Sequence, residues 1–217
     1  MEDFALARIL KFLPGIILGL TVHEFSHAYI AYRCGDSTSK EQGRLTLNPF
    51  KHIDLLGFMM LMVAGFGWAK PVEFNEQNLR NPEKDVIKIA VAGPFSNALT
   101  AIVLSVLYSA FFHFIPAYQV SWLRILQEVL LYAIYINWGL FIFNLIPLPP
   151  LDGSHLLLNY FKKFPSLYEA MYKYGSYIFF GLILVMVITK INVLPIGPVI
   201  NFLTEGLLTL LNGLFPA

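Results

Sequence analysis

Two histidines and a glutamate lie inside an apolar run near the start of the chain. His23, Glu24 and His27 have the spacing His-Glu-x-x-His, and the residues around them, 12–32, are mostly apolar. On a helix, residues four apart lie on the same side, so both imidazoles point in one direction. This geometry suits two ligands of one tetrahedral zinc ion. The adjacent Glu24 is then placed to act as general base toward a water that the metal activates.

The same three residues have a second interpretation, a polar contact between helices without metal. The spacing has only three fixed positions, so it also arises by chance in soluble chains. Ionisable groups inside a bilayer are costly and need partners, which makes a chance occurrence in an apolar segment less plausible. The apolar surroundings therefore favour the metal site.

A proline-rich block carries the second group of polar residues. Residues 144–153 read NLIPLPPLDG and follow a long apolar segment. Three prolines cannot continue a regular helix, so the helix ends here. Irregular backbone at membrane depth persists only beside protein or a cavity. A site with two histidines needs a further protein ligand and one open position, and Asp152 is the candidate for that ligand.

The composition predicts an integral membrane protein. Of 217 residues, 57% are hydrophobic and only 13% are charged, whereas soluble domains carry about 25% charged residues. We expect residues 1–217 to form one domain in the cell membrane. The net charge of +1 gives no reason to expect nucleic acid binding, and the single cysteine, Cys34, excludes an internal disulfide. The N-terminus lacks the features of a removable signal peptide.

The predicted fold class is an all-α polytopic membrane protein. Crossing a bilayer takes about 20 helical residues, and five segments are long and apolar enough: 9–32, 86–114, 122–147, 174–190 and 194–215. A sixth apolar stretch, 55–69, is shorter and reads as a short span or a re-entrant segment. The alternating runs 44–47 and 71–74, which flank it, predict a small β-hairpin element. We hypothesise that one of these runs binds the substrate as an added strand.

The depth of the polar groups favours the re-entrant interpretation of 55–69 over a full span. His23 and His27 lie late in the first span and Asp152 follows the third, so both spans must run in the same direction for the side chains to meet. This holds if 55–69 is re-entrant. Only Arg8, Lys11, Arg124 and Lys190 then lie on the side opposite the site, and the other eleven of the fifteen basic residues lie on its side. The positive-inside rule places the site toward the cytoplasm and the N-terminus outside.

Five segments together resemble the site-2 protease family of intramembrane zinc metalloproteases. They are HEFSH (23–27), GRLTLNPFKHID (43–54), GFGWAKPV (65–72), AGPFSN (92–97) and NLIPLPPLDG (144–153). The resemblance implies that His23, His27 and Asp152 bind one Zn²⁺ per chain and that Glu24 is the base. It also implies that Asn144 helps to hold the scissile carbonyl or its oxyanion, although Asn144 also suits a role as cap of the broken helix end.

The resemblance implies transmembrane proteins as substrates and the lipid bilayer as surroundings, and it predicts no oligomeric state. Alternative functions are a membrane zinc protease for peptides that are not transmembrane, a metal transporter and a catalytically silent scaffold. A transporter would need polar spans leading through the membrane, whereas the polar groups here converge at one depth. Of the remaining polar residues, Asn97 suggests an interhelical hydrogen bond or a place beside the site, and His52 and Asp54 suggest helix caps. His155 suggests support of a ligand or an interfacial position.

Overall fold

The computed structural model describes residues 2–64, 67–115, 121–189 and 194–214, except for the side chains of residues 2–8, 63, 64, 114 and 187. In chain order, the elements are α1 (Glu2–Cys34), α2 (Thr38–Glu41), η1 (Pro49–Lys51), α3 (Leu55–Ala64), η2 (Glu76–Asn78), α4 (Pro82–Phe114), α5 (Ser121–Asn144), α6 (Gly153–Phe161), α7 (Pro165–Thr189) and α8 (Ile196–Leu214). The all-α prediction agrees with this order.

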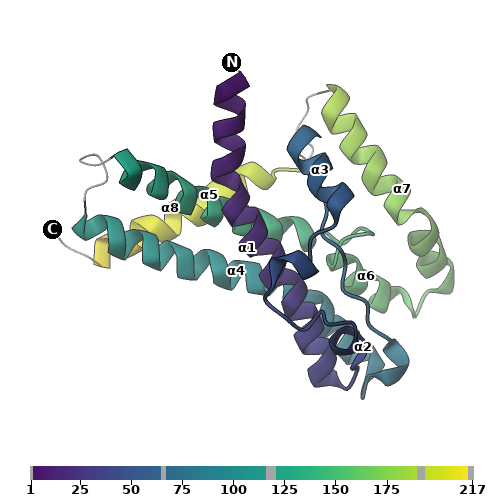
Figure 1. Cartoon of the computed structure of the whole chain (residues 1–217). Helices are drawn as coiled ribbons and strands as arrows, with labels where there is room; N and C mark the ends of the chain where they lie inside the picture. Colours follow the sequence, from purple (N-terminus) through teal and green to yellow (C-terminus); the bar gives the residue numbers. More distant parts are fainter. Residues whose placement is uncertain (1, 65–66, 116–120, 190–193, 215–217) are drawn as a thin grey trace.

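Helices α1, α4 and α5 pack against one another as the core of the molecule (Figure 1). Glycines let α1 and α5 approach closely: a Cβ on Gly15 would lie 2.6 Å from Ala133 Cα, and one on Gly19 would lie 3.0 Å from Asn137 Oδ1. Both residue numbers rise together along this contact, so α1 and α5 run in the same direction. This confirms the direction that was predicted from the depth of the polar groups.

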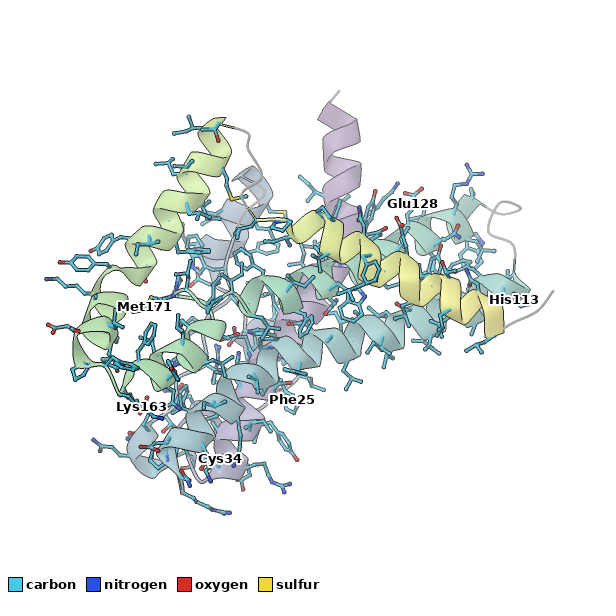
Figure 2. The ribbon with its side chains drawn as sticks, turned by 180° about the vertical axis from the view of Figure 1, so that it is seen from behind. Phe25, Cys34, His113, Glu128, Lys163 and Met171 are labelled. Atoms are coloured by element: carbon cyan, nitrogen blue, oxygen red, sulfur yellow. The ribbon has the colours of Figure 1, made fainter. Side chains whose placement is uncertain are left out.

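Helix α4 runs antiparallel to α1 and α5. Asn97 contacts the carbonyl of Gly19, whereas Ile89, earlier in α4, contacts His27, later in α1. Helix α8 packs along α4 and α5, as Figure 2 shows from behind, and α6 packs on α4 and α7. Between the two parallel helices α1 and α5, the chain therefore runs back once in the opposite direction, through α4.

Three helices of the described residues are long and apolar enough to cross a membrane, namely Ile9–Cys34, Pro82–His113 and Ser121–Asn144. They match the predicted spans 9–32, 86–114 and 122–147. The predicted spans 174–190 and 194–215 correspond to α7 and α8, which are not among these three, and residues 190–193 lie outside the described residues. A count of five spans stays a prediction.

The two ends of segment 53–69 lie side by side. Ile53 and Ala69 form an antiparallel bridge, and the N–H of Lys70 donates to the carbonyl of His52 at 2.8 Å. The chain thus leaves through α3 and returns to the place where it began, as expected of a re-entrant segment. Asp54 accepts from Gly57 N at 2.7 Å and caps α3, as its position suggested.

The predicted β-hairpin does not form: the described residues contain only the isolated bridge above, and neither 44–47 nor 71–74 is a strand. Some of their backbone N–H groups have other partners. Thr46 N donates locally to Arg44 O, Val72 N donates to the side chain of Glu24, and Pro71 has no N–H to offer. Short alternating runs do not pair as strands when their backbone N–H groups already donate to other acceptors.

Two buried charged residues hold the extended segment 70–75 and the following η2 in place. Asp36 is fully buried and accepts from Asn75 N and Asn78 Nδ2, both at 2.9 Å. Burial alone would raise the pKa of Asp36, but these bonds and two from Thr38 outweigh it, so the pKa is lowered. The guanidinium of Arg44 donates to the carbonyls of Lys51 and Lys70, which precede and follow the segment 53–69.

Candidate metal centre

The structure brings His23, His27 and Asp152 together, although Asp152 follows α5 and the histidines belong to α1. The Nε2 atoms of His23 and His27 lie 3.0 Å apart. Oδ2 of Asp152 lies 3.1 Å from Nε2 of His23 and 3.4 Å from Nε2 of His27. A tetrahedral zinc ion with bonds of 2.0–2.1 Å separates its donor atoms by about 3.3 Å. The triangle of donor atoms therefore has the size that zinc requires.

Hydrogen bonds fix which nitrogen of each histidine carries the proton. His23 Nδ1 lies 2.8 Å from Asn97 Oδ1, and His27 Nδ1 lies 2.7 Å from the carbonyl oxygen of Ile89. Both oxygens only accept, so each Nδ1 donates, and in the neutral imidazole each Nε2 then presents a lone pair. Two lone pairs thus converge with a carboxylate oxygen.

Asp152 completes a set of donor atoms that repel one another without a cation. Its Oδ2 is buried and has no hydrogen-bond donor. A buried acceptor is costly without a partner, and a zinc ion between the three atoms supplies one. The residues present fit the metal.

Hydrogen bonds to α1 and α5 fix the orientation of the Asn97 amide, which belongs to α4. Its Nδ2 donates to Gly19 O at 2.9 Å and to Asn137 Oδ1 at 3.0 Å, and Asn137 Nδ2 donates in turn to Ala133 O at 2.8 Å. Only Oδ1 of Asn97 is left to face His23. The interhelical hydrogen bond suggested for Asn97 is therefore present, and the sequence analysis missed Asn137, whose signal was a lone amide inside an apolar span.

Replacing Asn97 with leucine is expected to weaken zinc binding by about 10- to 100-fold, because such ligand-supporting hydrogen bonds have effects of this size. Leucine keeps the volume but removes the acceptor that holds His23 in the required tautomer. Competition with a chelator of known zinc affinity measures the change. Asn201→Leu, on an exposed side of α8, is the matched control. Equal affinity of Asn97→Leu and wild type would contradict the supporting role.

A cavity of ≈ 670 Å³ opens onto the three donor atoms. Glu24 lies in its wall, is 8% exposed and accepts a hydrogen bond from Val72 N at 2.9 Å. Val72 belongs to the extended segment, so this segment forms one side of the cavity and orients the carboxylate. The role of Val72 was missed because the donor is a backbone group.

Two further predicted residues also line this cavity. Asn144 lies at the end of α5, and its Nδ2 donates to Leu140 O at 3.0 Å, so its amide satisfies a carbonyl of the last helical turn. His155 lies on α6 near Asp152, and burial lowers its pKa.

Two other histidines lie away from the metal centre. His52 lies apart from the donor atoms, with Nε2 donating to Thr46 O. His113 lies at the far end of α4 (Figure 2).

Gly93 of α4 provides the space for both imidazoles. A Cβ there would lie 2.7 Å from Cε1 of His23 and from Cε1 of His27, and it would also strike His27 Nε2. Any side chain at this position would therefore occupy the volume of the rings.

Comparison with known proteins gives one family and several relatives. The profile of peptidase family M50 matches residues 112–187. "Putative zinc metalloprotease YwhC" of Bacillus subtilis is 36% identical over 204 residues, which are 92% of this chain and 90% of that protein. "Putative zinc metalloprotease Rip2" of Mycolicibacterium smegmatis is 32% identical over 146 residues, 65% of this chain and 53% of that protein. "Putative zinc metalloprotease MJ0611" of Methanocaldococcus jannaschii is 29% identical over 153 residues, 69% of this chain and 71% of that protein. No solved structure matches significantly.

Proposed function

The chain belongs to peptidase family M50, the site-2 proteases, and is a zinc metalloprotease; on this premise we propose that it hydrolyses peptide bonds in or near the transmembrane segments of membrane proteins. One observation carries the proposal. The donor atoms of His23 and His27 belong to the candidate span Ile9–Cys34 and open into a cavity between membrane-type helices. A peptide bond that reaches this site must enter the layer of the spanning helices.

We assign one zinc ion per chain to His23, His27 and Asp152. When bound there, zinc polarises a peptide carbonyl and lowers the pKa of water to about 7. Glu24 takes the proton of the attacking water and passes it to the leaving amine. The N–H of Val72 holds the carboxylate in place for both transfers.

Asn144 is the proposed donor to the oxyanion. A side-chain amide has two N–H hydrogens, and only one is needed for the bond to Leu140 O. The second is available to the carbonyl oxygen of a substrate in the cavity, where a fixed donor stabilises developing negative charge. The capping role and the catalytic role are thus compatible in one side chain.

The substrate must present an unwound segment, because a helix hides its carbonyls in hydrogen bonds to N–H groups four residues on. The cavity has an extended wall, 67–74, which suits an extended partner better than a helical one. We propose five spans with the N-terminus outside and the site toward the cytoplasm, as the distribution of basic residues favours.

The test is cleavage of transmembrane test substrates by the purified protein in liposomes, with the cut positions mapped by mass spectrometry. We expect cuts within or at the edge of the transmembrane segment. Replacing the helix-breaking residues of a substrate with leucine should slow cleavage by about 10-fold or more, since local unwinding becomes harder. Cleavage confined to soluble peptides or to extramembrane loops would refute intramembrane proteolysis and favour a protease for other peptides.

A further inference from the structure

A second cavity of ≈ 240 Å³ lies between α1, α3 and α5. Its walls are mostly apolar and include Ile17, Phe58, Leu61 and Ile136. The hydroxyl of Thr21 in this wall donates to Ile17 O, and His52 donates through Nε2 to Thr46 O, while the buried Nδ1 of His52 has no hydrogen-bond partner among the described residues. The interior therefore suits an apolar group.

This second cavity shares a wall with the catalytic cavity. The shared residues are Leu20, Gly67, Trp68, Ala69, Leu140 and Phe143. A chain segment bound in the catalytic cavity can therefore place a side chain in the smaller one. Residues 67–69 of this wall lie against α3, because Gly57 has no Cβ to strike the carbonyl of Trp68.

The smaller cavity lies on the side of the metal centre away from the loop that follows α1. The middle of its α1 stretch, 16–21, precedes the middle of the stretch from His23 to His27 by six to seven residues, which is about 10 Å at 1.5 Å per residue. Extended chain covers about 3.3 Å per residue, so the cavity is within about three residues of a bond at the metal centre.

We propose that this cavity is a specificity pocket for a large apolar side chain of the substrate, leucine or phenylalanine, within three residues of the scissile bond on the side away from that loop. This rests on the proposed function. Apolar protein cavities of about 150 Å³ bind benzene, so the pocket has room for an aromatic ring. The occupant is a substrate side chain because six residues of the pocket wall also line the catalytic cavity.

The experiment uses one transmembrane substrate in liposomes, with alanine, leucine or phenylalanine at each of three positions on either side of the scissile bond. Leucine or phenylalanine should raise kcat/KM by about 10- to 100-fold over alanine at one position on one side only. Ile17→Phe, which fills the pocket, should reduce this preference to about 3-fold or less. Ile102→Phe, on a 40% exposed position of α4, is the matched control and should keep the preference.

A photo-crosslink keeps the test informative if Ile17→Phe fails to fold. A benzophenone side chain at the preferred position should crosslink to Phe58 or Leu61 in the Glu24→Gln variant. Three results would each refute the pocket and leave the proposed function standing. The first is cleavage with equal kcat/KM for alanine, leucine and phenylalanine at every position. The second is a preference that Ile17→Phe leaves unchanged, and the third is crosslinking only to residues of other helices. Absence of any transmembrane cleavage would overturn the proposed function and the pocket with it.

Discussion

Glu24→Gln is expected to retain zinc and to lose about 10²- to 10⁴-fold in kcat, the usual contribution of a general acid–base. Glutamine has the shape of glutamate, and its carbonyl oxygen can still accept the hydrogen bond from Val72 N. It cannot take a proton from water. Parallel measurement of bound zinc and of initial cleavage rates in the two proteins separates proton transfer from metal binding.

Glu73→Gln is the control for this change, because Glu73 is an exposed carboxylate on the same extended segment. We expect it to keep both zinc and activity. If Glu24→Gln keeps the wild-type rate, Glu24 is not the base. If it loses the metal, Glu24 belongs to the set of ligands, and the assignment to His23, His27 and Asp152 is incomplete.

The parts of the site that depend on local spacing could be predicted from the sequence. His23 and His27 follow from a helical repeat, and Asp152 follows from prolines that must end a helix at membrane depth. The direction of α1 and α5 also followed, because the cost of unpartnered charge in a bilayer requires the polar groups to meet. Each of these inferences uses a constraint that acts on a single segment or on its depth.

The remaining parts depend on how distant segments fit together. The backbone N–H of Val72 and the carbonyl of Ile89 have no sequence signal, since every residue carries these groups. Asn137 became informative only when its position opposite Asn97 was known. The hairpin prediction was wrong because local strand propensity is weak beside the hydrogen bonds that Thr46 and Val72 make to other partners.

The glycines also show which features the sequence predicts and which require the structure. A glycine in an apolar helix indicates close packing in general, but which neighbour approaches depends on the packed helices. Gly15 and Gly19 allow α5 to pack closely against α1, whereas Gly93 leaves space for the two imidazole rings. The first two set the distance between the helices, and the third leaves the volume in which two histidines can face one metal.

Gly93→Ala is therefore expected to weaken zinc binding by about 100-fold or more and to reduce cleavage at least as much, since a misplacement near 1 Å already costs about 10²-fold in activity. The added methyl would lie 2.7 Å from Cε1 of each imidazole, closer than van der Waals contact permits. Either the rings rotate away from Asp152 or α4 moves and stretches the bond from His27 to Ile89 O. Zinc titration with a competing chelator and the cleavage rate at saturating zinc measure the two effects.

Gly181→Ala is the matched control, because a Cβ at Gly181 of α7 meets nothing within 4 Å. Alanine is a better helix former than glycine by about 1 kcal/mol, so both variants gain helix propensity and only Gly93→Ala crowds the metal centre. A stable Gly93→Ala protein with impaired zinc binding shows that the space beside the rings, and not the flexibility of α4, is what the glycine supplies. Wild-type affinity in Gly93→Ala would mean that the histidines bind the metal in a position farther from α4, and the triangle of donor atoms described above would then be wrong.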